Sequence, residues 1–173
     1  MSAVTRCLII DGYNIINAWP ELKKLGENGL EHSRDKLLEL MEDYRAYKGI
    51  KVIIVFDAHM VKGSMEKHEK YGGTEVVFTK EYETADAYIE KLADEMGKLY
   101  EIVVASSDWL VQQVVMGRGA ARISARELYL EVMRTKKGMQ DKYLIRKSVE
   151  KHTIENRIDA KVYEVLDKIR HEN

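Results

Sequence analysis

The stretch Lys51-Val-Ile-Ile-Val-Phe-Asp57 decides the fold of this chain, because it is the strongest predicted strand and it ends in an acid. An unbroken apolar run indicates a strand that is buried on both faces, as the strands of parallel sheets are. The same pattern occurs over residues 7–10, before Asp11, and over residues 101–105, before Ser106. We therefore expect a buried, mostly parallel sheet.

Segments with helical spacing of apolar residues lie between these strands. The spacing predicts helices over 31–47, 85–98, 109–116 and 125–134, and further short strands over 75–78 and 121–123. Residues 58–74 are a predicted loop, and so is the segment around Trp19 and Pro20. Strands that alternate with helices form right-handed βαβ units, so the predicted fold class is α/β, a three-layer sandwich with a mostly parallel central sheet.

The C-terminal region differs in composition from the rest. Beyond Gly138 we predict two charged helices, over 140–151 and 154–170. The chain is thus expected to consist of an α/β domain over 1–137 and a charged helical C-terminal extension over 138–173.

Length and composition exclude several classes of protein. With 173 residues, 45% of them hydrophobic, the chain can bury a core, which argues against wholesale disorder. It has no apolar run of the roughly 18 residues that a membrane span needs. The stretch that begins Met1-Ser-Ala-Val4 does not resemble a secretory signal. The single cysteine, Cys7, excludes an internal disulfide and a Cys-based zinc site. We expect a cytoplasmic protein without a membrane partner.

The net charge of −1 conceals an uneven distribution. Residues 116–152 carry 10 basic and 4 acidic side chains, whereas the residues before them are acidic overall. This basic block favours an anionic partner such as RNA, although a solvated helix face would have the same composition. The candidate RNA-binding cations are Arg118, Arg122, Arg126, Arg134, Lys136 and Lys137.

Acidic residues gather at the predicted strand ends. Asp11, Asp57 and Asp108 each follow a strand, and Asp86, with Glu83 before it, begins a helix. Parallel strands end at the same edge of a sheet, where ligands bind. Clustered carboxylates repel one another unless a cation offsets their charge, and oxygen ligands without Cys or paired His suit Mg²⁺ or Mn²⁺. Such a site can hydrolyse phosphodiesters with one metal ion or two.

Each of these acids also has a structural interpretation. Asp11 can form an Asx turn, and Asp57 can simply terminate its strand. Glu83 and Asp86 suit a helix N-terminus, and Asp108 suits an N-cap. The convergence on one edge of the sheet, rather than any single acid, therefore supports a metal site.

Other residues near the predicted site are candidates for positioning or binding. Asn14 and Ser106 lie beside the acids, where they can orient a carboxylate or a water molecule, with turn and cap roles as the alternatives. His59 follows Asp57 by two residues and lies either in the cleft or on the surface. Trp19 is a candidate for stacking on an RNA base, with a position over the core as the alternative.

Four stretches resemble the YacP-like branch of the NYN domains, which are nucleases related to the PIN fold. They are LIIDGYNIINAWPEL (8–22), VIIVFDAH (52–59), VVFTKEYETADAYIEKL (76–92) and VVASSDWLVQQ (103–113). These stretches occur in order over roughly the first three-quarters of the chain. TKEYETAD, with its spacing from SSDW, is more specific than DGYN alone.

The resemblance implies a divalent-metal-dependent endoribonuclease whose catalytic acids match Asp11, Asp86 and Asp108. Asn14 belongs to the same DGYN motif, and Asp57 and Glu83 are further candidates for binding the metal. The resemblance also implies association with the ribosome and cleavage of mRNA during translation, with the basic block as a candidate surface for ribosomal RNA.

Other functions stay open. The same fold can bind RNA or the ribosome without cutting, in which case Asp11→Asn would leave function intact and charge reversal at Arg134, Lys136 and Lys137 would abolish it. An aspartyl phosphotransfer domain is a third interpretation. A dinucleotide-binding Rossmann domain is disfavoured, because no G-x-G-x-x-G follows the first strand. The sequence leaves the oligomeric state open.

Overall fold

A computed structural model describes residues 5–59 and 61–171. Residues 1–4, which begin the stretch that does not resemble a secretory signal, lie outside the described residues. The described strands form one sheet in the order β3-β4-β2-β1-β5-β6. Every neighbouring pair is parallel except β3 and β4, which are antiparallel. The strands are β1 (Arg6–Asp11), β2 (Lys51–Phe56), β3 (Lys67–Tyr71), β4 (Thr74–Phe78), β5 (Glu101–Ala105) and β6 (Ala121–Ile123).

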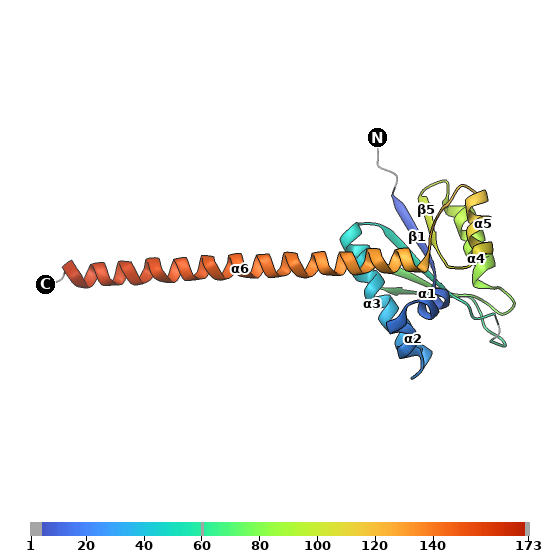
Figure 1. Ribbon diagram of the computed structural model, residues 1–173, viewed down its shortest axis with the longest axis horizontal. Coiled ribbons are helices and arrows are strands. Elements are labelled where there is room, and N and C mark those ends of the chain that lie inside the picture. Colours follow the sequence, from blue (N-terminus) through green and yellow to red (C-terminus); the bar gives the residue numbers. More distant parts are fainter. Residues whose placement is uncertain (1–4, 60, 172–173) are drawn as a thin grey trace. The chain divides into compact units, whose positions relative to one another are not determined.

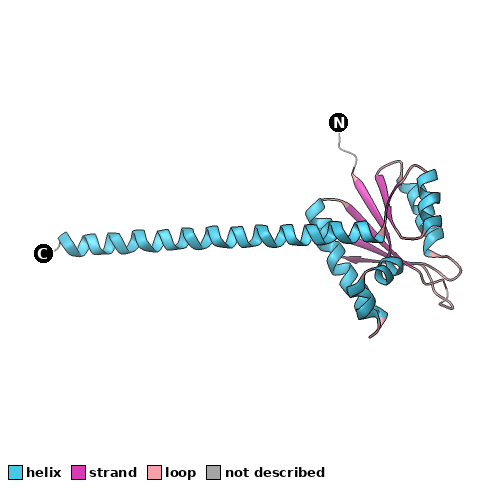
Figure 2. Ribbon diagram, in the orientation of Figure 1, coloured by secondary structure: helices cyan, strands magenta, loops and turns pink. Residues whose placement is uncertain are grey.

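Side chains of β1 are buried on both faces of the sheet. Leu8 and Ile10 join one hydrophobic cluster, whereas Cys7 and Ile9 join another, and none of the four is more than 3% exposed. Two buried faces require cover on both sides, and Figure 2 shows the strands between two groups of helices. The predicted three-layer α/β sandwich is therefore confirmed.

Helices cover the two faces unequally. On the face of Leu8 and Ile10 lie α1, α2, α3 and the first turns of α6, and on the other face lie α4 and α5 (Figure 1). Thr84 begins α4 by accepting the backbone N–H of Ala87 at 3.2 Å, as an N-cap does. The helices are α1 (Gly12–Ala18), α2 (Pro20–Gly26), α3 (Leu30–Lys48), α4 (Ala85–Met96), α5 (Trp109–Gly117) and α6 (Ala125–His171).

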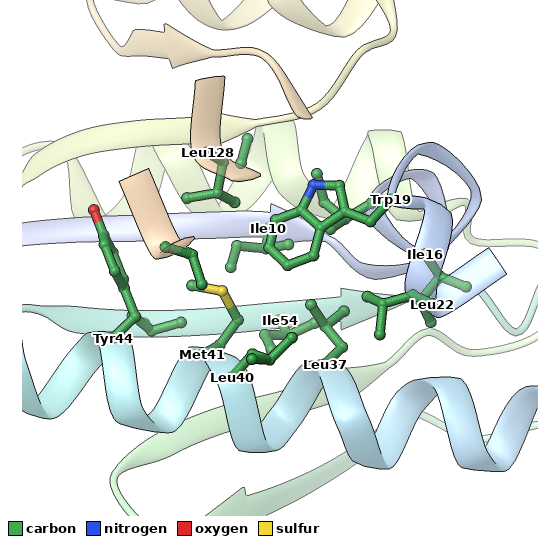
Figure 3. Close-up of a cluster of buried hydrophobic side chains, with 14 of the residues drawn as sticks. Ile10, Ile16, Trp19, Leu22, Leu37, Leu40, Met41, Tyr44, Ile54 and Leu128 are labelled. Carbon is green, nitrogen blue, oxygen red and sulfur yellow. The ribbon is translucent and has the colours of Figure 1, made fainter. Parts of the chain in front are cut away.

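The segment after β1 is helical, so the loop predicted around Trp19 and Pro20 is wrong. Pro20 begins α2, where its fixed φ and missing N–H are tolerated. Ile16 and Leu22 are buried in the same cluster as Trp19 (Figure 3). Helices of seven residues are too short to be stable alone or to show a clear apolar period, so tertiary packing stabilises them.

Part of the loop predicted over 58–74 is also a strand, β3. All of its residues are exposed, so it has no apolar pattern that sequence analysis can detect. It forms by antiparallel pairing with β4 across a turn at Gly72, whose φ of +59° favours glycine. Glu42 of α3 accepts hydrogen bonds from the backbone N–H groups of Gly73 and Thr74 and fixes this turn.

A single helix, α6, replaces the three helices predicted over 125–134, 140–151 and 154–170. Gly138 does not interrupt α6, because one glycine in a helix costs only about 1 kcal/mol relative to alanine. The only proline of the chain, Pro20, lies elsewhere. The predicted breaks between these helices are therefore wrong, since the glycine in this region is tolerated and the region contains no proline.

The chain divides into two compact units, Met1–Arg134 and Thr135–Asn173, whereas the predicted division followed residue 137. The first unit contains the sheet and both hydrophobic clusters. Within the residues that the structure describes, the helices are all too short or too polar to span a membrane.

Candidate active site

The acids at the strand ends converge because the order of the strands reverses at β1. This strand lies between β2 and β5, so its carboxyl end is the switch point of the sheet, where ligands of α/β proteins bind. Asp11 is the last residue of β1, Asp57 comes directly after β2, and Asp108 follows shortly after β5. Three adjacent parallel strands thus each bring an aspartate to one edge.

Asp11 is the most buried of these carboxylates, with 9% of the residue exposed. Its Oδ1 accepts the backbone N–H of Asn14 at 3.4 Å and caps α1. Burial raises the pKa of Asp11 to about 6, the Asn14 N–H opposes that rise, and the charges of Asp86, Asp57 and Asp108 add to it. The other three aspartates are therefore within electrostatic range of Asp11.

Asp86 reaches the same edge from the first turn of α4. Partial burial raises the pKa of its carboxyl group, and the charges of Asp108 and Asp57 raise it further. The aspartates Asp11, Asp57, Asp86 and Asp108 are called the acid cluster below. Their negative charges repel one another, and a bound cation would offset that repulsion.

Asp57 differs from the other members of the acid cluster, because neighbouring groups already hydrogen-bond to both of its carboxylate oxygens. Oδ1 accepts the backbone N–H of His59 at 3.0 Å and pairs with the His59 ring, and Oδ2 accepts the backbone N–H of Ala85 at 3.1 Å. Burial raises the pKa of Asp57, but these hydrogen bonds outweigh it and hold the pKa below its ordinary value. Asp57 therefore ties the end of β2 to the start of α4.

Asp108 is the N-cap of α5. Its Oδ1 accepts the backbone N–H of Leu110 at 2.8 Å and that of Val111 at 3.4 Å. The hydroxyl of Ser106, which is fully buried, accepts the backbone N–H of Asp108 at 3.1 Å. The cap role and a role in the acid cluster are compatible, because the cap fixes the carboxyl group at the edge where β5 ends.

Asn14 links two of the segments that carry acids. Its Oδ1 accepts the backbone N–H of Ser107 at 2.7 Å, and its own backbone N–H donates to Asp11. The Ser107 hydroxyl accepts the backbone N–H of Ala125 at 3.4 Å, which adds the start of α6 to the same network. Asn14 thus positions the loop of Asp108 relative to Asp11.

Glu83 lies just before α4, and one of its carboxylate oxygens, Oε2, is buried without a hydrogen-bond partner in the described part of the chain. Burial and the charge of Glu66 raise the pKa of Tyr88 to about 12, and the charge of Glu83 contributes to that rise. Glu83 therefore lies within electrostatic range of Tyr88, and its role as a metal ligand stays a prediction.

The donor chemistry of the acid cluster fits Mg²⁺ or Mn²⁺, since its donors are carboxylate oxygens whose charges repel one another. Over residues 5–59 and 61–171, however, no group of three or more Asp, Glu, His or Cys side chains is arranged to hold a metal ion.

Two of the predicted RNA-binding arginines already have protein partners. Arg118 pairs with Glu90 and Asp94 of α4, which offset its charge. Arg122 donates to Oε1 of Gln112 at 2.7 Å. Gln112 in turn donates to the carbonyl oxygen of Ser106 at 2.6 Å, so Arg122 supports the loop that carries Asp108.

The remaining predicted cations, Arg126, Arg134, Lys136 and Lys137, are exposed. Arg126 lies in the first turn of α6 and directly follows Ala125, whose backbone N–H donates to the hydroxyl of Ser107. Arg134 lines a groove of about 500 Å³ between the first turns of α6 and strands β1, β5 and β6, on the face of the sheet to which Leu8 belongs. Lys136 and Lys137 are exposed in the second unit.

Trp19 does not lie on an RNA-binding surface, so that prediction is wrong. Trp19 lies among buried hydrophobic side chains (Figure 3) and is 1% exposed. Its Nε1–H donates to the carbonyl oxygen of Ala125 at 2.8 Å. Its ring packs edge-on against Tyr129, with the centroids 5.4 Å apart. The indole is a core residue that joins the start of α6 to the sheet, and its faces are not available to a base.

Sequence analysis did not identify Ser107 or Gln112, which act on the site through hydrogen bonds. Ser107 donates its backbone N–H to Asn14, and almost any residue could do so, which means that the residue type at position 107 does not indicate this bond. The spacing of Gln112, one helical turn after Asp108, is the signal that the sequence offers. In the structure the residue is 6% exposed. Both residues position the Asp108 loop.

Comparisons with known proteins agree with this architecture. The family model described as the YacP-like NYN domain matches residues 8–171. The protein YacP of Bacillus subtilis (strain 168) is 52% identical over 126 residues, which make up 72% of this chain and 74% of that protein. The crystal structure of Rae1 (YacP) from Bacillus subtilis is similar with a TM-score of 0.72 at 41% identity, covering 96% of this chain and 95% of that chain. A point mutant of Rae1 (YacP) matches with a TM-score of 0.70 at 43% identity, over 79% of this chain and 80% of that one.

Proposed function

Because this chain belongs to the YacP-like NYN domain family, whose members are nuclease-like, we propose that it is a divalent-metal-dependent endoribonuclease that hydrolyses RNA phosphodiesters. The observation that carries the proposal is the acid cluster. Aspartates from four separate segments lie at the switch point of the sheet. Burial raises the pKa of Asp11 to about 6, and the charges of the other three aspartates add to that rise.

The residues of the cluster have different parts in the proposed reaction. Asp11, Asp86 and Asp108 would hold Mg²⁺ or Mn²⁺, with Asp57 and Glu83 as further candidates. When bound, such an ion supplies positive charge that stabilises the phosphorane-like transition state and lowers the pKa of a water molecule. Asn14 keeps the Asp108 loop at its place beside Asp11 through Ser107, and Asp57 keeps α4 in place through Ala85.

The proposed substrate is mRNA on translating ribosomes, as the family resemblance implies, which would place the protein in the cytoplasm. The exposed Arg126 near the acid cluster and the exposed Lys136 and Lys137 of the second unit would contact phosphates. Each phosphate contact should make affinity fall as salt rises, because binding releases counterions from the RNA.

The test is cleavage of labelled mRNA on translating ribosomes, in Mg²⁺ and in EDTA. Wild type should cut only with the metal, and Asp86→Asn should not cut. Asp43→Asn is the matched control, since Asp43 is an exposed acid of α3 that lies outside the acid cluster. Cleavage by Asp86→Asn equal to that by wild type would contradict the proposal.

A second candidate function is binding of RNA or the ribosome without cleavage. It is favoured by the lack, among the described residues, of three carboxylates already arranged around a metal position. Under this alternative Asp11→Asn retains full cellular function, whereas charge reversal at Arg134, Lys136 and Lys137 abolishes it. Complementation with these two variants therefore separates the candidates.

A further inference from the structure

We propose that Tyr82 and Trp109 are aromatic platforms on which unpaired bases of the RNA stack, one on each side of the acid cluster. This inference rests on the proposed nuclease function and adds two base-binding residues to the proposed site. The substrate would be single-stranded RNA, because the bases of a duplex are already stacked and paired and cannot reach the two rings.

Both rings are exposed beside the acids. Trp109 is 66% exposed and directly follows Asp108, and Tyr82 is 88% exposed and precedes Asp86 by four residues. The Tyr82 N–H donates to the carbonyl oxygen of His59, which follows β2 and Asp57, whereas Trp109 follows Asp108 after β5. Strands β2 and β5 lie on either side of β1, which ends in Asp11. The segments that carry the two rings therefore flank the same cluster.

Tyr82 is held in an unusual backbone conformation. Its φ of +67° makes it the one non-glycine residue with positive φ over residues 5–59 and 61–171. Such conformations persist where the surroundings enforce them, and they concentrate at functional sites. The Tyr82 N–H donates to the carbonyl oxygen of His59 at 3.1 Å. The N–H of the preceding residue, Glu81, donates to the carbonyl oxygen of Ser64 at 2.9 Å. The ring is therefore presented from a fixed backbone.

Trp109 is held in a comparable way. It is the first residue of α5, and the N-cap bonds of Asp108 to Leu110 and Val111 fix the backbone on which it sits. Its exposure contrasts with that of Trp19, which is 1% exposed. A fixed backbone lowers the conformational entropy that a ring loses when a base stacks on it, so both residues are preorganised for binding.

An exposed cation accompanies each ring. Lys80 lies two residues before Tyr82, and neither Lys80 nor Arg126 has an ion-pair partner in the described part of the chain. Arg126 belongs to the helix start that the bond from Ala125 to Ser107 holds beside the Asp108 loop. A cation for the phosphate next to an aromatic ring for the base is the arrangement by which proteins bind single-stranded nucleic acid.

Tryptophan fluorescence tests the proposal without relying on activity. The chain has two tryptophans, and only Trp109 is accessible to a base. The full-length protein with Asp86→Asn, which should not cut, is titrated with a single-stranded oligoribonucleotide in Mg²⁺. We expect quenching of the emission, no such quenching when Trp109→Phe is added, and little quenching by a duplex of the same sequence.

Binding and cleavage by surface variants complete the test. In the wild-type background, Trp109→Ala and Tyr82→Ala should each weaken binding of the single strand by about 5- to 100-fold, the range found for the loss of one stacked base. Trp109→Phe should retain most of the affinity. Tyr71→Ala is the matched control, because Tyr71 is 42% exposed but pairs with Thr74 at the amino edge of the sheet.

The outcomes separate this inference from the proposed function. Metal-dependent cleavage with no quenching of Trp109, and with unchanged affinity in both alanine variants, would overturn the platforms and leave the nuclease in place. Quenching and weakened binding without any cleavage would support the platforms and overturn the nuclease. An equal loss of affinity in Tyr71→Ala would also overturn the platforms, since it would show that any exposed aromatic residue contributes.

Discussion

The side-chain Oδ1 of Asn14 accepts the backbone N–H of Ser107 at 2.7 Å, although the two residues are 93 positions apart in the sequence. This bond joins the start of α1, capped by Asp11, to the loop that ends at Asp108. Two carboxylates of the acid cluster therefore depend on one amide side chain for their relative position.

Asn14→Ala should lower the rate of RNA cleavage more than it lowers stability. The bond is exposed, so water can replace the lost acceptor, and its loss should cost only about 0.5–1.5 kcal/mol in the free energy of unfolding. Displacement of the Asp108 loop should reduce kcat by at least tenfold. Asn14→Asp keeps an oxygen acceptor and should restore stability better than alanine. Equal kcat in wild type and Asn14→Ala would contradict the positioning role.

Removing a negative charge from the acid cluster should stabilise the metal-free protein. Partial burial raises the pKa of Asp86, and repulsion from Asp108 and Asp57 raises it further, so the ionised form is disfavoured in the fold. In EDTA at pH 7, Asp86→Asn should therefore unfold at a higher temperature than wild type. Added Mg²⁺ or Mn²⁺ should raise the Tm of wild type, because a ligand that binds only the native state stabilises it. The metal should not raise the Tm of the variant.

Asp11 should make the metal-free protein less stable as pH rises through the weakly acidic range. Its pKa is about 6 in the folded protein and 3.8 ordinarily. Between these values the folded state binds more protons than the unfolded state, so the free energy of unfolding falls with rising pH, by up to about 3 kcal/mol. Denaturant titrations in EDTA at pH 4 and pH 6.5 measure this loss. Asp11→Asn should show a smaller loss than wild type.

Trp19 should matter for folding rather than for RNA contact. Replacing a buried tryptophan with alanine costs about 3–5 kcal/mol, so Trp19→Ala should unfold at much lower denaturant concentration than wild type. Trp19→Phe retains packing but loses the bond from Nε1 to Ala125, and its cost should be smaller. Affinity of folded Trp19→Phe for single-stranded RNA should equal that of wild type. If folded Trp19→Phe bound single-stranded RNA more weakly than wild type, the prediction that Trp19 stacks on an RNA base would be supported instead.

Glu42 should stabilise the β3–β4 turn in a pH-dependent way. Hydrogen bonding from Arg45 lowers the pKa of Glu42 to about 2, and the N–H of Gly73 and the hydroxyl of Thr74 also lower it, against an opposing effect of burial. Its contribution is present above pH 4.5 and is lost as pH falls toward 2. Glu42→Gln should cost about 1–3 kcal/mol at pH 7 and nothing near pH 2. The exposed Glu39→Gln, which disrupts only a surface pair with Lys36, is the control.

The α/β fold class was predictable because it depends on local pattern. The apolar runs of β1, β2 and β5 are continuous, and a strand of that kind must be covered on both faces. Each run ends in or near an acid, so the carboxyl edge could be identified as the candidate site from sequence alone. Helices α3, α4 and α5 have enough turns, or a clear enough cap, to be placed within a few residues.

Elements that depend on distant partners were not predictable in this way. Strand β3 is exposed along its whole length and exists because β4 and Glu42 hold it. Helices α1 and α2 are stabilised by burial of Ile16 and Leu22 rather than by their own length. Trp19 follows the same rule, since its position in the core depends on a bond to Ala125, 106 residues away.

The sequence by itself determined that the chain forms a mostly parallel sheet with aspartates at its carboxyl edge. Strand burial and strand termination are local properties, so they can be recognised in the sequence. Only the tertiary structure decided how those aspartates differ. It showed Asp57 held by His59 and Ala85, Asp11 buried with a raised pKa, and Asn14 joined to Ser107. Apart from the local bonds between Asp57 and His59, these differences arise from burial and from contacts between residues that are far apart in the chain, and such contacts exist only once the sheet has formed.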